Sequence, residues 1–273
     1  MARLRALALS THPGPGAAVT VITVLLAIAG GLDLWRIVLL GLVMALDQTS
    51  VGLSNDWIDA DRDREVGRTD KPVARGDIDR TLVRNVAWAT AAASLVLSIP
   101  LGWQAALAHL VFLGGAWAYN AGLKNTAVSV LPYLISFGAL PSVVSLSAGQ
   151  PAFAPFWTTA AGALLGAGAH FANVLPDLED DARTGIRGLP HRLGRSASQL
   201  VTWISLLAAA TFLGLGIGLG TVIGTVGIII AAVLAAAGLV LGTLRTPGRV
   251  LFRLVIAAAM VDVAMLVIGG AQL

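Results

Sequence analysis

Long apolar segments recur along this chain, and they constrain its fold more than any other feature. A helix needs about 20 predominantly apolar residues, and as few as about 17, to cross the hydrocarbon layer of a membrane. Nine segments approach or exceed that length: Ala17 to Leu32, Ile37 to Leu53, Leu82 to Leu101, Ala105 to Gly122, Ala127 to Leu146, Phe156 to Val174, Leu200 to Gly218, Val222 to Leu244 and Val250 to Gly270. Lipid offers the backbone no hydrogen-bond partners, and these continuous runs lack the alternation of a barrel strand. We therefore predict an all-α, polytopic membrane protein with nine transmembrane helices in a bundle.

Composition agrees with a membrane protein. Hydrophobic residues make up 56% of the chain and charged residues 12%, and the mean hydropathy is +0.82. Such a chain is too apolar for a soluble globular domain. The net charge of +3 does not indicate a nucleic-acid partner, because the basic residues lie in short segments between apolar ones. The absence of cysteine excludes disulfides, thiolate catalysis and cysteine-ligated metals.

The placement of basic residues predicts the orientation in the bilayer. With the N-terminus in the cytoplasm, 17 of the 18 Lys and Arg residues fall on the cytoplasmic side, and only Arg36 lies opposite. Positive residues are enriched on the cytoplasmic side of membrane proteins. We therefore expect an integral protein of a prokaryotic plasma membrane, with its N-terminus in the cytoplasm and its C-terminus outside.

One acidic pattern occurs twice in the sequence. It consists of an Asn at position i, an Asp at i+4 and a second Asp at i+8. The copies are Asn55, Asp59 and Asp63, and then Asn173, Asp177 and Asp181. A spacing of four places side chains on one face of a helix. Carboxylates so placed repel one another unless a cation lies between them. Mg²⁺ is the natural candidate, because it prefers oxygen ligands and is often shared with a substrate phosphate.

The two copies occupy equivalent positions in the predicted topology. Each begins a long, charged cytoplasmic segment, 54–80 or 176–199, and four predicted helices separate them. This is typical of a parallel internal repeat with a site between its halves. We expect one domain over residues 1–273, with halves at about 17–146 and 156–270.

Two such faces opposite each other could hold two or three Mg²⁺ ions with a diphosphate between them. The metals would stabilise charge on a departing diphosphate. Arg68 and Lys71 follow the first copy, and Lys124 lies at the next cytoplasmic helix end. The site would face the cytoplasm and open into an apolar central cavity. A substrate with a diphosphate head and a long hydrocarbon tail fits both halves of that description.

These residues also resemble a known family. Asn55-Asp56-x-x-Asp59-x-x-x-Asp63 followed by Lys71-Pro72, Tyr119 followed by Lys124, and Asn173-x-x-x-Asp177-x-x-x-Asp181 followed by Leu189-Pro190-His191-Arg192-Leu193-Gly194 are similar to the motifs of the UbiA superfamily of membrane prenyltransferases. The resemblance covers essentially the whole chain. It implies Mg²⁺-dependent ionisation of an isoprenyl diphosphate and capture of the allylic cation by a small aromatic or other acceptor. Some members instead cyclise the cation as terpene cyclases.

The resemblance also implies a role for each matching residue. The metal ligands would be Asn55, Asp59, Asp63, Asn173, Asp177 and Asp181. The diphosphate would be bound by Arg68, Lys71 and Lys124. Asp56 would support the ligands or an acceptor, and the ring of Tyr119 would stabilise the cation. Pro176 and the extra Glu179-Asp180 pair make the second copy less regular than the first.

Several other residues carry open interpretations. Asp47 lies within a predicted helix, where a charge is costly, and it either faces the cavity or forms a hydrogen bond between helices. Trp57 and Trp117 are candidates for lining the cavity. For Asp262 we expect a structural pairing, and for His191 a place in a surface loop. His12 and His170 receive no assignment.

Two rival functions remain at this point. A terpene cyclase would share the ionisation residues, since cavity shape decides the fate of the cation. A transporter could also contain parallel repeats and intramembrane carboxylates, although its site would lie near the bilayer midplane.

Overall fold

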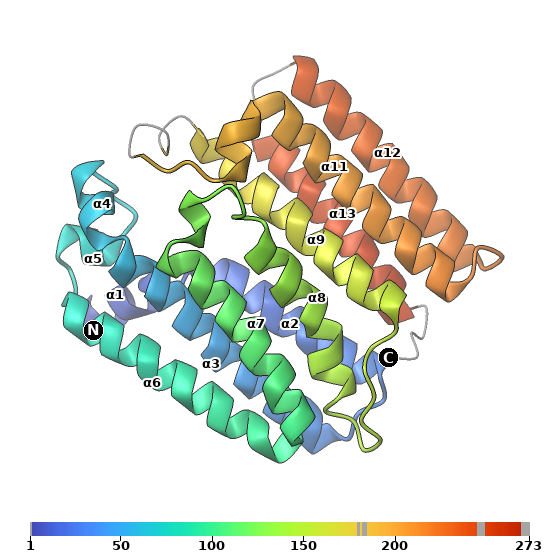
Figure 1. The fold of residues 1–273 in the computed structure, drawn as a ribbon, viewed down its shortest axis with the longest axis horizontal. Helices are drawn as coiled ribbons and strands as arrows, with labels where there is room; N and C mark the ends of the chain where they lie inside the picture. Colours follow the sequence, from blue (N-terminus) through green and yellow to red (C-terminus); the bar gives the residue numbers. More distant parts are fainter. Residues whose placement is uncertain (1, 179–180, 182–184, 245–248, 269–273) are drawn as a thin grey trace.

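The computed structural model describes residues 2–178, 181, 185–244 and 249–268 (Figure 1). Within these ranges the regular elements are all helices. In chain order they are α1 (Ala2–Ser10), α2 (Pro13–Ala29), α3 (Leu34–Ile58), α4 (Ala60–Glu65), α5 (Pro72–Arg75), α6 (Arg80–Ser98), the 3₁₀ helix η1 (Ile99–Leu101), α7 (Trp103–Ala121), the 3₁₀ helix η2 (Leu123–Asn125), α8 (Leu131–Ser145), α9 (Phe156–Val174), the 3₁₀ helix η3 (Leu175–Asp177), α11 (Leu189–Ile217), α12 (Val222–Leu244) and α13 (Arg249–Ile268).

Each predicted apolar segment falls on a helix, and the prediction of an all-α protein is confirmed. By length and apolarity, four helical stretches of the described chain can cross a membrane: Leu34–Ile58, Arg80–Leu101, Leu189–Ile217 and Val222–Gly242. The pair α1 and α2, bent by 59°, would add a fifth. Crossing by all nine segments stays a proposal.

Helix ends explain where the prediction of boundaries was inaccurate. α11 begins at Leu189, eleven residues before the predicted start, with Pro190 in its first turn. Proline is favoured there because its missing N–H would have no helical partner. A kink at Gly194, where φ is 75°, separates this first turn from the rest. α6 begins two residues early, since the side chain of Asp79 accepts a hydrogen bond of 2.8 Å from the backbone N–H of Leu82.

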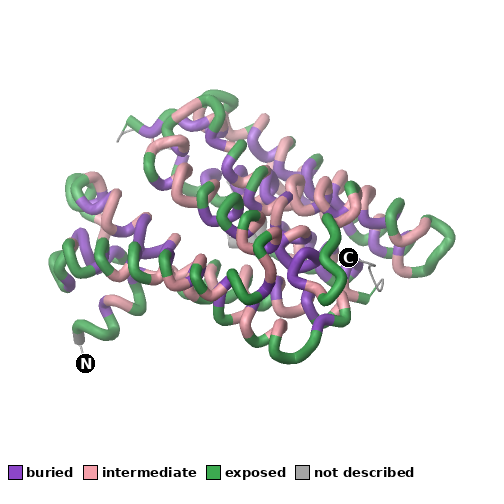
Figure 2. Tube along the Cα trace, turned by 60° about the horizontal axis from the view of Figure 1, so that its bottom comes forward, coloured by how far each residue is buried: buried purple, intermediate pink, exposed green. Residues whose placement is uncertain are grey.

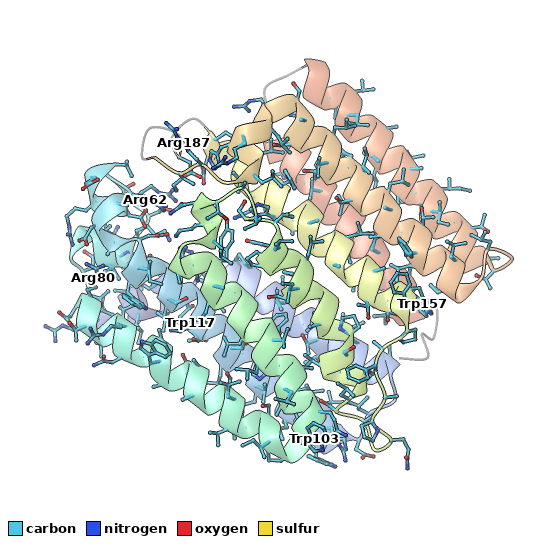
Figure 3. The ribbon with its side chains drawn as sticks, viewed as in Figure 1. Arg62, Arg80, Trp103, Trp117, Trp157 and Arg187 are labelled. Carbon is cyan, nitrogen blue, oxygen red and sulfur yellow. The ribbon has the colours of Figure 1, made fainter. Side chains whose placement is uncertain are left out.

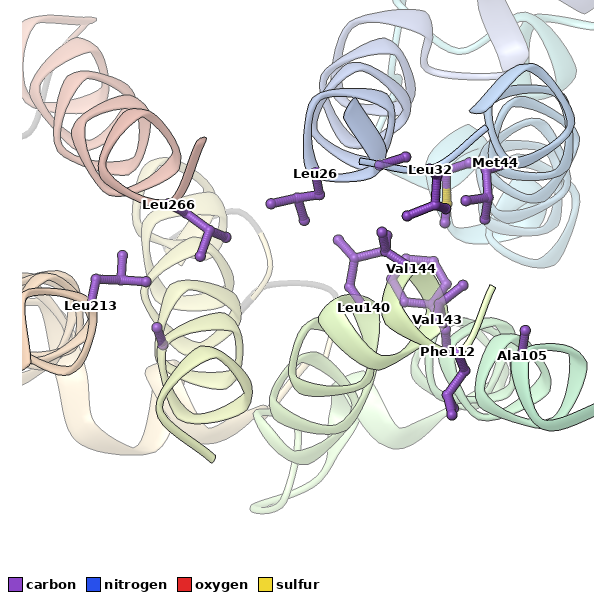
Figure 4. Close-up of a cluster of buried hydrophobic side chains, with 14 of the residues drawn as sticks. Leu26, Leu32, Met44, Ala105, Phe112, Leu140, Val143, Val144, Leu213 and Leu266 are labelled. Carbon is purple, nitrogen blue, oxygen red and sulfur yellow. The ribbon is translucent and has the colours of Figure 1, made fainter. Parts of the chain in front are cut away.

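The main apolar core joins helices from both halves of the chain. It includes Leu26 of α2, Met44 of α3, Phe112 of α7, Leu140 of α8 and Leu213 of α11 (Figure 4). α8 and α9 pack closely, as do α3 and α6 and also α9 and α11. Small residues at helix contacts allow such close packing in membranes.

A second apolar cluster supports the first charged segment. It brings together Ala6 of α1, Leu53 of α3, Ala60 of α4, Val73 of α5 and Val83 of α6. Residues 54–80 are therefore not one extended loop, because they include the end of α3 and the two short helices α4 and α5, which pack with α1, α3 and α6 (Figure 1). α3 and α9 end on the same side of the bundle, so both acidic patterns lie there (Figure 1).

Candidate functional site

The first acidic pattern lies on one continuous helical face. The N–H of Asp59 donates to the carbonyl of Asn55 at 3.0 Å, and the N–H of Asp63 donates to the carbonyl of Asp59 at 2.8 Å. These bonds continue the helical register across the junction of α3 and α4. The side-chain amide of Asn55 also donates to Asp59 Oδ2 at 3.1 Å. The spacing of four therefore brings Asn55 into contact with Asp59 on this face, and Asp56, Asp59 and Asp63 are all buried.

Two lysines from outside the pattern converge on this face. Lys124 of η2 donates hydrogen bonds to both carboxylate oxygens of Asp59. Burial lowers the pKa of the Lys124 ammonium, and the negative charge of Asp59 opposes that shift. Lys71 donates to Asn55 Oδ1 at 2.9 Å and lies 3.3 Å from Asp56 Oδ1. The structure thus joins Lys71 and Lys124 to the first pattern.

Arg62 is a site residue that the sequence analysis missed. Its Nη2 donates to Asp59 Oδ2 at 3.1 Å and to Asp63 Oδ1 at 3.2 Å. In a sequence, an arginine inside a charged segment is usually interpreted as solvent-exposed, so Arg62 was not predicted. However, its position three residues after Asp59 predicts a contact within one helical turn.

Arg68 lies at the edge of this group. Its guanidinium forms two hydrogen bonds of 2.8 Å to the carboxylate of Asp70, and this pairing lowers the pKa of Asp70 to about 2. The same hydrogen bonding raises the pKa of Arg68, and the charges of Asp177 and Asp63 add to that shift. Arg68 therefore contacts Asp70 directly and interacts electrostatically with both acidic patterns.

The second pattern is less regular, as Pro176 suggested. α9 ends at Val174 and continues as η3, so Asp177 leaves the regular helix. Asn173 and Asp177 are exposed, whereas Asp181 is partly buried. Burial raises the pKa of Asp181, and the charges of His191 and Arg62 oppose this rise. Glu179 and Asp180 lie outside the described residues.

His191 does not occupy the surface position that we expected. Its side chain is 8% exposed, and Nε2 lies 3.4 Å from Asp181 Oδ2. The expectation was wrong because α11 begins at Leu189, which places His191 in a packed first turn rather than in a loop.

Charges link the two patterns at one end of the bundle. Arg62 contacts Asp59 and Asp63 and acts electrostatically on Asp181. In Figure 3, Arg62 lies on the α4 side and Arg187 on the side that leads into α11, at the same end of the molecule. Charged side chains of the two segments therefore lie at the same end of the molecule.

Tyr119 belongs to a group of aromatic rings beside the acidic residues. Its ring meets Tyr133 edge-on at a centroid distance of 5.1 Å and His170 at 5.6 Å. Tyr133 and His170 are 5.0 Å apart. Nε2 of His170 lies 3.1 Å from the hydroxyl of Ser129, which accepts a hydrogen bond from the N–H of Leu189. The sequence alone gave no reason to place His170 in the site, although it precedes Asn173 by one helical turn.

The other candidates fall away from the acidic face. Asp47 is fully buried and lies 3.0 Å from Nε2 of His109, so it forms the hydrogen bond between helices that we had left open. Trp117 donates to the hydroxyl of Ser50 at 3.0 Å. Trp57 and Trp117 both pack against the second apolar cluster.

Asp262 departs from our expectation of a structural pairing. Its carboxylate is fully buried in α13, and neither oxygen has a hydrogen-bond partner among the residues the structure describes.

The chemistry of the first pattern fits a hard cation. Within the described ranges, no three His, Cys, Asp or Glu side chains are grouped so that they could hold a metal ion. However, both carboxylate oxygens of Asp56 and Oδ2 of Asp63 are buried without a hydrogen-bond partner in the described structure. Buried anionic oxygens normally have a hydrogen-bonding or cationic partner. The donor set therefore suits Mg²⁺ in type and charge.

Fold and site together define a helical integral membrane protein with a buried, charged site at one end of its bundle. The chain belongs to the UbiA prenyltransferase family, which matches residues 17–262. The resemblance seen in its motifs is thereby confirmed.

Known proteins show how far the likeness extends. Digeranylgeranylglyceryl phosphate synthase from Archaeoglobus fulgidus is 29% identical over 188 residues, which span 65% of this chain and 62% of that relative. A solved UbiA homolog from Aeropyrum pernix K1 has a TM-score of 0.72 and 21% identity, covering 91% of this chain and 97% of its own. A UbiA homolog from Archaeoglobus fulgidus bound to GPP and Mg²⁺ has a TM-score of 0.72 and 16% identity, covering both chains fully. The solved structures establish the UbiA-like fold.

Proposed function

We propose that this protein is a Mg²⁺-dependent prenyltransferase that ionises an isoprenyl diphosphate and transfers the prenyl group to a small acceptor. One observation carries this proposal. Buried carboxylates of the first pattern meet Arg62, Lys71 and Lys124 at the end of an apolar helical bundle. A diphosphate with metal ions needs both signs of charge, and a prenyl chain needs the apolar surroundings.

Metal binding would use the oxygen donors of both patterns. Asn55, Asp59, Asp63, Asn173, Asp177 and Asp181 would hold two or three Mg²⁺ ions. When bound, the ions would neutralise the diphosphate and stabilise the negative charge of the leaving group. The oxygens of Asp56 and Asp63 that accept no hydrogen bond in the described structure support a cation here. The homolog bound to GPP and Mg²⁺ supports the same choice of ion.

The chain's own cations would bind and orient the diphosphate. Lys71, Lys124 and Arg62 present N–H donors within one buried group, and charge-assisted hydrogen bonds to phosphate oxygens are strong. Arg68 would act from the edge of the site. Asp56, buried beside Lys71, would keep that ammonium directed toward the first pattern.

The reacting carbon would lie toward the aromatic rings. Tyr119 lies within the electrostatic reach of Asp59 and Asp181, and Tyr133 and His170 pack edge-on against its ring. The face of an aromatic ring attracts a cation. The three rings would therefore stabilise the allylic cation and exclude water that could otherwise capture it.

The proposed setting is a bundle that crosses the membrane nine times, with its N-terminus in the cytoplasm. The site would open on the cytoplasmic side, and the prenyl chain would extend into an apolar cavity between the two halves of a parallel repeat. The common end point of α3 and α9 supports this arrangement (Figure 1).

The acceptor is the part of the proposal that an experiment must identify. The archaeal relative is named for a digeranylgeranylglyceryl phosphate product, so a glyceryl phosphate acceptor should be tested beside aromatic ones. Purified protein in lipid nanodiscs would be incubated with Mg²⁺ and C10 to C25 prenyl diphosphates, with and without acceptors. We expect diphosphate release that depends on an acceptor. Abundant cyclic hydrocarbon without an acceptor would instead establish a terpene cyclase.

Matched variants make this test specific. Asp59→Ala and Asp177→Ala should each lower turnover by roughly 100-fold or more, because each removes a ligand of the Mg²⁺ ions that would stabilise the charge of the leaving diphosphate. Asp77→Ala is the control, since Asp77 lies in the same charged segment but pairs with Arg75. Chelation by EDTA should abolish turnover, and Mg²⁺ should restore it. Full diphosphate turnover by Asp59→Ala, together with loss of solute uptake into vesicles, would replace the enzyme with a transporter.

A further inference from the structure

We propose that the N-terminal segment 2–12 is part of the site, and that His12 is a positioning residue that holds the ammonium of Lys71 at the first acidic pattern. This inference rests on the proposed function, because it assigns Lys71 to diphosphate binding. The segment lies outside the part of the chain that matches the family, which begins at residue 17. Its role is therefore argued from its contacts alone.

The backbone at His12 is held in an unusual conformation. His12 connects α1 to α2 and has φ 51° and ψ 61°, and it is the one non-glycine residue of the described chain with a positive φ. Left-handed backbone is unfavourable for such residues and persists where surrounding contacts enforce it.

Glycine at position 52 is one of those enforcing contacts. A Cβ at Gly52 would lie 2.0 Å from the carbonyl oxygen of Thr11. The bend between α1 and α2 therefore lies directly on the backbone of α3, one turn before Asn55. Only glycine permits so close an approach.

This bend brings the imidazole of His12 to Lys71. Nε2 of His12 lies 2.8 Å from Nζ of Lys71. An ammonium only donates hydrogen bonds, so Nε2 must be the acceptor and the ring proton must lie on Nδ1. Burial and the positive charge of Lys71 lower the pKa of His12 to about 4, which keeps the ring neutral at physiological pH.

His12 completes the surroundings of the Lys71 ammonium. Lys71 also donates to Asn55 Oδ1 at 2.9 Å and lies 3.3 Å from Asp56 Oδ1. The ammonium thus donates two hydrogen bonds, to His12 and Asn55, and forms an ion pair with Asp56. A lysine side chain is long and flexible, and Lys71 precedes the four-residue helix α5, so the hydrogen bond to His12 restricts where the charge can lie.

Apolar residues of α1 also hold the N-terminal segment against α5, the helix that follows Lys71. Ala6 and Leu7 of α1 pack in the second apolar cluster with Val73 of α5 and Leu53 of α3. The N-terminal segment therefore contacts the region around Lys71 in two ways. Its apolar side chains pack on α5, and His12 contacts the Lys71 ammonium. A charge fixed in advance stabilises a bound anion more effectively than one that must be ordered on binding.

The first test measures the position of Lys71 without any substrate. The chain contains two lysines, Lys71 and Lys124, so acetylation by acetic anhydride can be followed at both by mass spectrometry in the full-length protein. His12→Ala should raise the rate at Lys71 several-fold relative to Lys124. His12→Gln supplies an amide oxygen as acceptor and should restore most of the protection. Equal Lys71 rates in wild type and His12→Ala would overturn the contact.

The second test measures diphosphate binding. Titration calorimetry with geranyl thiolodiphosphate and Mg²⁺ should show a roughly 10-fold weaker Kd for His12→Ala, as expected for loss of one hydrogen bond to a charged group. KM for geranyl diphosphate should rise by a similar factor while kcat changes little. His12→Gln should bind nearly as wild type. The double variant His12→Ala/Lys71→Ala should have nearly the same Kd as Lys71→Ala alone, because both substitutions remove the same hydrogen bond.

Controls separate this inference from the proposed function. Arg5→Ala, on an exposed position of α1, should match wild type in both tests. If wild type turns over geranyl diphosphate but His12→Ala keeps the wild-type KM, the role of His12 fails alone. If wild type neither binds nor consumes prenyl diphosphates, the proposed function fails and this inference fails with it. Should His12→Ala not fold, an unchanged KM for Lys71→Ala would still overturn the proposal.

Discussion

The ring of Tyr119 provides a test of how single residues act in this site. If the ring face stabilises the allylic cation, Tyr119→Phe should keep most of the activity, because it retains the ring. Tyr119→Ala should lower kcat by roughly 10-fold to 30-fold, which corresponds to about 1–2 kcal/mol for a cation–π contact. Single-turnover measurements with geranyl diphosphate would report this step directly.

The neighbouring Tyr133 serves as the comparison for that prediction. It packs on Tyr119 and also stacks parallel to Phe137 at 6.0 Å. Tyr133→Phe preserves both ring contacts and should change kcat by less than about threefold. A Tyr119→Phe variant as inactive as Tyr119→Ala would contradict a role for the ring and favour one for the hydroxyl.

Two buried aspartates should respond to substitution with opposite signs. Asp262 lies in α13 without a hydrogen-bond partner in the described structure, whereas Asp47 is paired with His109. An unsatisfied buried polar group costs about 1–3 kcal/mol. Asp262→Leu should therefore raise the melting temperature in detergent. Asp47→Leu should lower it, because it leaves the His109 side chain buried and unpartnered.

Activity measurements complete the comparison of the aspartates. Asp262→Leu should retain wild-type diphosphate turnover, since the Asp262 carboxylate forms no hydrogen bond with a site residue in the described structure. Loss of turnover by a stable Asp262→Leu protein would show instead that this carboxylate has a functional role, which is the usual reason for an ionisable residue inside a membrane span.

Local spacing accounts for the site residues that the sequence predicted. Asn55, Asp59 and Asp63 could be grouped because four-residue spacing acts within one helix. His12 and His170 could not, because their contacts join segments that are distant in sequence. Arg62 was missed for another reason, since a charge in a charged segment does not reveal whether it is solvated.

At the scale of elements, α8 and α9 pack through glycine. A Cβ at Gly166 of α9 would lie 2.5 Å from the carbonyl oxygen of Tyr133 and 2.8 Å from Cβ of Phe137. Backbone atoms cannot move aside as a flexible side chain can. Gly166→Ala should therefore destabilise the protein by about 1–3 kcal/mol, seen as a lower melting temperature.

The matched control for Gly166 lies in α7. A Cβ at Gly114 would meet no atom within 4 Å. Gly114→Ala should leave stability unchanged or raise it by up to about 1 kcal/mol, because alanine favours the helix. Since Gly166 contacts the backbone of Tyr133, Gly166→Ala should also lower kcat more than Gly114→Ala. Equal melting temperatures for the two variants would contradict the close packing of α8 on α9.

The sequence predicted helices well where they were long and apolar, and poorly where they were short and charged. α4 and α5 have no apolar periodicity to reveal them, and they fold because Ala60 and Val73 pack onto α1 and α3. The early start of α11 had a local signal in Pro190, but the charges around it obscured that signal.

For the whole molecule, the outward surface agrees with a lipid environment. Large apolar side chains are exposed on several helices, among them Val38 of α3, Trp88 of α6, Val111 of α7 and Ile229 of α12. In Figure 2 the buried residues lie between the helices and the exposed ones on their outer sides. Rows of exposed apolar residues on many helices are unusual in a soluble protein and expected in a bilayer.

The orientation in the membrane can be tested because the chain has no cysteine of its own. Glu65 lies in the charged segment predicted to be cytoplasmic, and Gln150 lies in the connection between α8 and α9 predicted to be outside; both are exposed. In intact cells, a membrane-impermeant maleimide should label Gln150→Cys and leave Glu65→Cys unlabelled. Both should be labelled once the membrane is permeabilised, and the cysteine-free parent should stay unlabelled throughout. The reverse labelling pattern would place the acidic site outside the cell. The orientation predicted from the positive-inside rule and the proposed cytoplasmic site would then both be wrong.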